Sequence, residues 1–167
     1  MGVMRKTGLP VDLADGEVDV SGTLAFPLKR GGTTADVKFD VAGDLLNLNS
    51  TRLVKGRSLR SKRMALVANN KGVEISGTGT FEGVAFEGRW KQPIGAGSDK
   101  STLRGTARIT PKALTAFSVA LPKGMFQGST SANVDLNFER GKSPRLKLRS
   151  NLQGATLNIP QLGWRKT

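Results

Sequence analysis

One nine-residue pattern occurs twice in this chain, at residues 18–26 (VDVSGTLAF) and 73–81 (VEISGTGTF), and a shorter version follows at residues 103–109 (LRGTARI). In each copy, apolar residues alternate with polar residues around a central Gly-Thr, which is the pattern of a strand with one buried face. A unit of this kind buries its apolar side only by stacking against its neighbours. The repeat therefore predicts one long sheet of similar strands, with a function that resides in a surface.

The composition excludes several kinds of chemistry. The 167 residues contain no cysteine, histidine or tyrosine, which excludes disulfides, thiolate or imidazole metal sites, and nucleophile systems built on Cys or His. The carboxylates are scattered over strand positions, and no serine has a recognisable base beside it, so we do not expect an enzyme, a cofactor or a metal. Hydrolysis by carboxylates alone stays open, because residues distant in sequence can converge.

Charge is unevenly distributed along the chain. The net charge is +13, but residues 1–50 hold 5 bases and 7 acids, whereas residues 51–167 hold 21 bases and 6 acids. A basic partner surface would therefore belong to the later strands. The longest apolar run, residues 64–68, is far shorter than the ~20 residues of a spanning helix, and no targeting segment is visible.

Alternation and turn residues predict one all-β domain over residues 1–167: an elongated, curved, mostly antiparallel sheet with one short helix. The helix is expected at residues 110–117, with Thr110 as N-cap and Pro111 at the first helical position. Turns are expected at residues 29–32, 69–72 and 82–83, a bend at residues 45–50, and a basic connector at residues 52–63. The nine expected strands are residues 17–26, 36–41, 63–68, 73–81, 83–91, 103–109, 129–138, 144–152 and 155–160.

Alternation also divides the side chains between two faces. The apolar set forms the candidate ligand-binding face: Val18, Val20, Leu24, Phe26, Val37, Phe39, Val41, Val73, Ile75, Phe81, Val84, Phe86, Trp90, Leu103, Ile109, Val134, Leu136, Phe138, Leu146 and Leu148. The basic set forms a candidate outer surface: Arg57, Arg60, Lys62, Arg63, Arg89, Lys91, Arg145, Lys147 and Arg149. The glycines Gly22, Gly77, Gly88 and Gly105 fall on the apolar side, where they allow curvature and leave room for a ligand.

Several segments carry a family resemblance. Residues 146–166 (LKLRSNLQGATLNIPQLGWRK), a strand pair that closes on a Pro-x-Leu-Gly-Trp-Arg-Lys tail, resemble the repeat unit of large AsmA-like envelope proteins. The Ser-Gly-Thr strands and residues 81–90 resemble the same repeat. The resemblance covers most of the chain and is nearest to alphaproteobacterial members with a long AsmA-like C-terminal region, although its motifs are structural and not catalytic.

This resemblance implies a phospholipid partner. Such proteins are anchored in the inner membrane and extend through the periplasm as an open β-groove that conducts phospholipid toward the outer membrane. The chain would then be a non-enzymatic, lipid-binding fragment of a longer protein, whose other parts contact bacterial membranes. Unpaired sheet edges would also favour self-association.

Two other interpretations remain open from the residues alone. In an arbitrary β-protein, an apolar stripe such as Phe39, Phe81, Phe86, Trp90 and Phe138 more often forms a closed core than a ligand groove. The basic charge alternatively suggests binding of nucleic acid or another polyanion, and residues 52–63, with six bases and no acid, are the strongest such segment. Against this, Trp90 and Phe86 are expected to face away from Arg89 and Lys91, whereas single-strand binders need aromatics and bases on one surface.

Overall fold

The computed structural model describes residues 14–26, 37–54, 56–95, 98–117, 119, 121–122, 124–159 and 164–166. Within them lie eleven strands and one short helix. Their bounds are β1 (Asp15–Ala25), β2 (Lys38–Val54), β3 (Arg57–Asn69), β4 (Gly72–Phe81), β5 (Val84–Pro93), β6 (Lys100–Ile109), α1 (Pro111–Ala116), β7 (Phe126–Gly128), β8 (Thr130–Glu139), β9 (Arg145–Arg149), β10 (Ala155–Ile159) and β11 (Trp164–Lys166).

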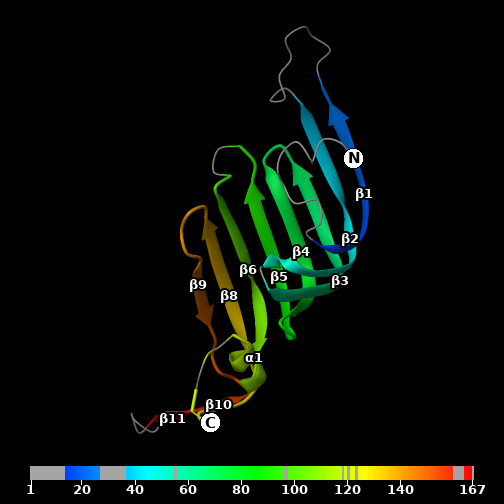
Figure 1. The fold of residues 1–167 in the computed structure, drawn as a ribbon. Coiled ribbons are helices and arrows are strands. Elements are labelled where there is room, and N and C mark those ends of the chain that lie inside the picture. The colour runs from blue at the N-terminus through cyan, green and yellow to red at the C-terminus, as the bar shows by residue number, and fades with distance from the viewer. Residues whose placement is uncertain are drawn as a thin grey trace.

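Most of the strands form one open sheet of eight, in the order β1-β2-β3-β4-β5-β6-β8-β9, and every neighbouring pair is antiparallel. Figure 1 shows this sheet as an elongated, curved surface with β1 at one edge and β9 at the other. A second sheet of three strands, β11-β10-β7, lies at the end near α1. The expected all-β, mostly antiparallel architecture is therefore confirmed, whereas β7 and β11 were not expected.

Short turns join the central strands, which explains why the sheet is a meander. Between β4 and β5, Glu82 and Gly83 have φ angles of 53° and 76°, the left-handed conformations of a two-residue hairpin turn. Between β3 and β4, the Asn69 side chain accepts a hydrogen bond of 2.9 Å from the Lys71 backbone N–H. Both turns were predicted. The turn expected at residues 29–32 lies outside the described residues.

The predictions for residues 45–63 were wrong. The expected bend at residues 45–50 lies within the continuous 17-residue strand β2, and most of the expected connector at residues 52–63 belongs to the ends of β2 and β3. Asn47 has a φ of 52°, and the register between β3 and β4 shifts between Arg60 and Met64. Each bulge shifts the alternation of apolar and polar residues by one position. The sequence of these long strands therefore lacks a continuous period of two, and it resembles a bend and a connector.

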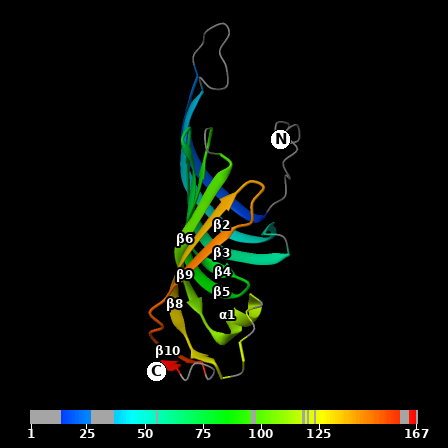
Figure 2. The ribbon, with the colours of Figure 1, turned by 90° about the vertical axis from the view of Figure 1, so that its left-hand side faces the viewer.

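The predicted helix is confirmed at its start. The Thr110 side chain accepts a 3.1 Å hydrogen bond from the Ala113 N–H, and Pro111 occupies the first helical position. At the other end of the helix, the Phe117 ring stacks on Phe81 with a centroid distance of 5.8 Å. Figure 2 shows α1 and the tip of the β2–β3 hairpin projecting from the same side of the sheet. The helix therefore lies at one end of the sheet and does not form a second layer over it.

The core is correspondingly small. Among the described residues, the buried apolar side chains are Met64, Val84, Ala113, Ala132 and Ala155, and no large side chain is completely buried. A single sheet without a covering layer buries its apolar side chains only partly. The open sheet leaves most of one apolar face accessible to a ligand or a partner.

Candidate functional site: the uncovered apolar face

Two rows of directly opposed residues cross the whole sheet. Because opposed residues in paired strands share a face, each row fixes one side of the sheet. The first row is Val20, Gly43, Leu66, Ile75, Trp90, Leu103, Leu136 and Leu146. The second is Val18, Leu45, Met64, Gly77, Gly88, Gly105, Val134 and Leu148. The side that carries these rows is called the apolar face, and the opposite side the polar face.

The other predicted ligand-face residues that pair within the sheet lie on the same apolar face. Opposed pairs here are Leu24 with Phe39, Gly22 with Val41, Val73 with Ala68, Phe81 with Val84, Phe86 with Ala107, Ile109 with Thr130 and Phe138 with Ser101. Phe26 and Val37 lie just beyond the ends of β1 and β2. The prediction missed several apolar-face residues on β2 and β3, because the bulges hide their alternation: Leu45, Leu48, Leu59, Met64, Leu66 and Ala68.

The apolar face is accessible, most of all at its two edges. On β1, Val18 is 63% exposed and Leu24 is 65% exposed, and on β9, Leu146 and Leu148 are 56% and 53% exposed. Towards the middle, Phe86 and Trp90 are half-buried by their neighbours. A contiguous apolar surface of this kind marks a site for a ligand, a membrane or a second protein.

A short row of glycines lies in the middle of the apolar face. Gly77, Gly88 and Gly105 oppose one another on β4, β5 and β6, so the backbone there carries no side chains. On β5, Phe86 and Trp90 flank Gly88 on the same face, and the Phe86 ring lies 3.5 Å from where a Gly88 Cβ would be. Glycine in a strand permits close approach of a ligand to the backbone, which makes this row the barest part of the face.

Arg57 differs from the other predicted basic-surface residues. It lies at the α1 end, where its Nη1 donates a 2.8 Å hydrogen bond to the carbonyl of Ala116. Its guanidinium lies 6.0 Å from the centroid of the Phe117 ring and 3.6 Å from the Glu82 carboxylate. This residue therefore ties the β2–β3 hairpin to the helix at one end of the apolar face, and it is not part of a free cationic surface.

The remaining predicted cations lie on the opposite side. By register, seven of them belong to the polar face: Arg60, Arg63, Arg89, Lys91, Arg145, Lys147 and Arg149. The eighth, Lys62, is exposed within the irregular segment of β3. Several of these cations are paired on the polar face. Arg63 donates to both carboxylate oxygens of Asp44 at 2.8 and 2.7 Å, and Glu74 contacts Arg89 at 3.0 Å and Lys91 at 2.9 Å. Apart from Arg57 and Lys62, the predicted cations are thus separated by the sheet from the aromatic side chains of the apolar face.

These ion pairs predict a dependence of stability on acid pH. The Lys91 hydrogen bond, and then the charges of Arg89 and Lys91, hold the pKa of Glu74 below its usual range. A carboxylate with a lowered folded-state pKa contributes stability that is present above its unfolded pKa of about 4.3 and is lost as pH falls through the folded value. We expect Glu74→Gln to lessen the fall in Tm between pH 6 and pH 3.

This effect should be small, since exposed pairs contribute on the order of 0.5 kcal/mol. Thermal unfolding of both proteins across that pH range measures it. The carboxyls of Asp44 and Glu139 also have lowered pKa values, caused chiefly by Arg63 and Lys142 respectively, so part of the acid dependence should remain in the variant. An identical acid slope in the two proteins would contradict the role given to Glu74.

A hollow of about 850 Å³ crosses six strands of the sheet, near the end where α1 follows β6. Most of its lining side chains belong to the polar face by register, among them Asn49, Arg60, Thr78, Thr80, Ala85, Glu87, Thr106 and Arg108. With Lys62, its lining carries three cations beside one carboxylate and several hydroxyls, which suits an anionic group. Sequence reasoning did not find this hollow, because its residues come from six strands.

The described residues bring together no group of three or more Asp or Glu side chains suited to hold a metal ion. Among the same residues, no helix has the length and hydropathy needed to cross a membrane. Comparisons with protein-family models, with characterised proteins and with solved structures found no match to this chain. The apolar face crosses all eight strands of the large sheet and carries exposed side chains at both edges, so a functional proposal rests on it.

Proposed function

We propose that this chain is a non-enzymatic, lipid-binding segment of an AsmA-like envelope protein. In this proposal, phospholipid acyl chains lie on the apolar face, and the segment contributes to phospholipid transport between the inner and outer membranes and to outer-membrane integrity. The observation that carries the proposal is the pair of residue rows that cross all eight strands, apolar except for their glycines, with no layer over them among the described residues.

The dimensions of the sheet are suited to acyl chains. Eight strands spaced about 4.8 Å apart form a surface roughly 34 Å wide, and a ten-residue strand is about 33 Å long. One acyl chain occupies about half of a bilayer core, roughly 15 Å. Each Å² of apolar surface removed from water contributes about 25 cal/mol, so a bound chain would stabilise a face that is otherwise hydrated.

The separation of side-chain types also supports a lipid. On β5, Phe86 and Trp90 are on the apolar face, whereas Arg89 and Lys91 are on the polar face. Acyl chains would contact only the first pair, and water would contact the second. Under this proposal the segment acts in the periplasm, within a longer protein that is anchored in the inner membrane, as its resemblance to AsmA-like repeats implies.

Phe86→Asp tests this function directly. Protein purified from a bacterial host is expected to release phospholipid on organic extraction, and the phospholipid per protein should fall about tenfold or more in the variant. The physical reason is that a carboxylate beside acyl chains costs several kcal/mol unless it is neutralised or reaches water. Lipid phosphorus measured against protein concentration gives the ratio.

Two matched variants isolate the cause. Ala85→Asp introduces the same charge one residue away, on the exposed polar face, and should leave the phospholipid content nearly unchanged. Phe86→Leu keeps the site apolar and should retain most of the lipid. All three variants must keep the β-rich circular-dichroism spectrum. The proposal fails if the unaltered protein carries no phospholipid, or if Ala85→Asp and Phe86→Asp reduce it equally.

A second candidate function is binding of a polyanion on the polar face. Arg60, Lys62 and Arg108 around the hollow favour it, together with the net charge of +13. Nucleic-acid binding of this type weakens steeply with rising salt, and each lost cation lowers the salt slope. Arg60→Ala and Arg108→Ala would then reduce binding of a single-stranded oligonucleotide in a titration over salt, whereas Trp90→Leu, outside the lining of the hollow, would not.

A further inference from the structure

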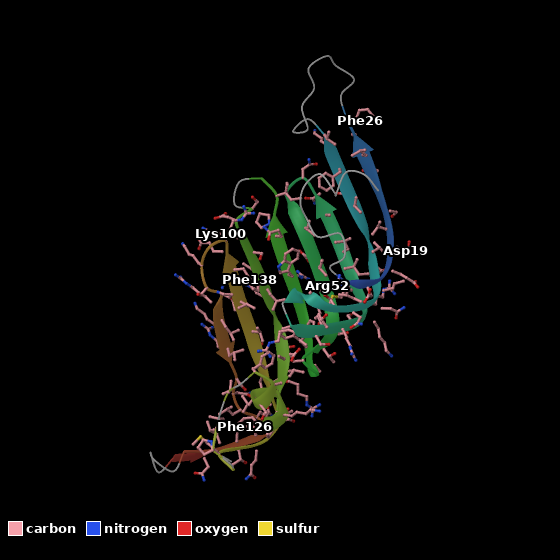
Figure 3. All side chains as sticks on the ribbon, in the orientation of Figure 1. Asp19, Phe26, Arg52, Lys100, Phe126 and Phe138 are labelled. Atoms are coloured by element: carbon pink, nitrogen blue, oxygen red, sulfur yellow. The ribbon has the colours of Figure 1, made fainter. Side chains whose placement is uncertain are left out.

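The two edges of the sheet carry opposite charges. β1 presents Glu17 and Asp19 on the polar face, and β9 presents Lys147 and Arg149 on the same face. Every residue of both strands is exposed, and Figure 3 shows Asp19 on β1 at the edge far from β9. None of these four side chains has an ion-pair partner within the described part of the chain.

Among the described residues, both edges also have a backbone side that pairs with no other strand. Within the described ranges, β1 pairs only with β2, and β9 pairs only with β8. An edge strand with unpaired N–H and C=O groups is a template for pairing with another chain. Because each of the seven pairings in the sheet is antiparallel, the first and eighth strands run in opposite directions. A copy displaced sideways would therefore place its β1 antiparallel to β9.

We propose that copies of this chain assemble head to tail, with β9 of one copy pairing with β1 of the next. One unbroken row of opposed residues begins at Asp19 and ends at Lys147, passing through Asp44, Ala65, Ser76, Arg89, Arg104 and Asp135. If the row continues into the next copy in the same register, Lys147 lies opposite Asp19 of that copy, and Arg149 lies opposite its Glu17. Opposite charges in directly opposed positions stabilise a strand pair.

The apolar residues match in the same register. The two rows of the apolar face begin at Val20 and Val18 and end at Leu146 and Leu148. Pairing therefore brings Leu146 beside Val20 and Leu148 beside Val18, side chains that are between 43% and 63% exposed in the isolated chain. The interface buries apolar area and joins the apolar faces of neighbouring copies into one surface.

Charge also disfavours the symmetric alternatives. A β1–β1 pair would bring the carboxylates of Glu17 and Asp19 against their counterparts, and a β9–β9 pair would do the same with Lys147 and Arg149. Like charges directly opposed in a sheet destabilise the pair. The remaining β9–β1 contact is heterologous, so it produces rings or open-ended chains of copies and not a symmetric dimer. The inference goes beyond lipid binding and does not depend on it.

Charge reversal on each edge tests the assembly. By sedimentation velocity, the unaltered protein should form species larger than a monomer as its concentration rises. A double variant of β1, Glu17→Lys with Asp19→Lys, should remain monomeric, and so should a double variant of β9, Lys147→Glu with Arg149→Glu. An equimolar mixture of the two variants should associate again through two complementary contacts. The unaltered basic β9 of the first variant meets the unaltered acidic β1 of the second, and the basic β1 of the first meets the acidic β9 of the second.

The mixture makes the experiment independent of misfolding, since only folded variants can restore the association. A chain that carries all four substitutions should also associate. The proposal is overturned if the unaltered protein stays monomeric at the highest concentration, or if association persists in both double variants, which would indicate contact through the apolar faces. Phospholipid content, measured in the same samples, should match the unaltered protein, so a failure of the lipid proposal is seen separately.

Discussion

Gly105→Ala is expected to destabilise the protein by about 3 kcal/mol, the upper part of the range for overpacked sites. A Cβ at this position would lie 2.0 Å from the Glu87 carbonyl oxygen and 2.7 Å from the Gly88 Cα. Both contacts are with the backbone of the neighbouring strand, which cannot rotate away as a side chain would. Because β6 is paired on both sides, with β5 and with β8, a displacement would disturb two ladders.

Gly88→Ala is the matched control for this substitution. Gly88 lies directly opposite Gly105, but a Cβ there would lie no closer than 3.5 Å to any neighbouring atom, which is an ordinary contact. Removing backbone freedom from the unfolded chain favours alanine at such a site by about 0.4–1 kcal/mol. Urea unfolding should show a large loss for Gly105→Ala and little change for Gly88→Ala. Equal losses of unfolding free energy in the two variants would contradict the prediction, because the close contact between strands at Gly105 would then have no effect on stability.

The strands with strict alternation were predictable from the sequence. β4 pairs with β5, and β6 with β8, in an unbroken register. Along β5 the positions of Phe86, Gly88 and Trp90 alternate with those of Glu87, Arg89 and Lys91. In such strands the period of two assigns both the secondary structure and the face of every side chain. The apolar face could therefore be predicted over this part of the sheet.

The β2–β3 hairpin could not be predicted in the same way. Leu45 and Leu48 lie on the apolar face, but Leu46, between them, is opposed to Arg63 on the polar face. At the irregularity near Asn47, odd-numbered residues before it and even-numbered residues after it lie on the apolar face. A single period of two does not fit across this point, so the segment resembles a leucine-rich bend in the sequence. The position of a bulge depends on how two strands pair, which the sequence of one strand does not specify.

Features that combine several strands were also beyond sequence reasoning. The alternation of β9 places Lys147 on one face, and that of β1 places Asp19 on one face. Lys147 and Asp19 lie at the two ends of a single row of opposed residues, and this follows only from the seven successive strand registers. The hollow on the polar face depends on the same registers, because its lining combines short segments of six strands.

Gly43→Ala is expected to detach β1 while leaving the rest of the sheet folded. A Cβ at Gly43 would lie 2.0 Å from the Asp19 carbonyl oxygen and 2.6 Å from the Val20 Cα, a clash as severe as that at Gly105. The two substitutions differ in which strand the new Cβ would displace. β1 is an edge strand that pairs only with β2 among the described strands, so it can separate without disturbing a second ladder, and regions of low local stability open independently.

Hydrogen exchange measured by mass spectrometry would locate the change. Amides of β1 should lose most of their protection in Gly43→Ala, whereas those of β4, β5 and β6 should keep theirs, and the main unfolding transition should move by much less than in Gly105→Ala. Self-association should also be lost, because the acidic edge that meets β9 of the next copy is no longer ordered. An equal loss of amide protection in β1 and β5 would contradict this prediction, because β1 would then unfold together with the rest of the sheet. The large effect expected for Gly105→Ala would in that case not result from the central position of β6.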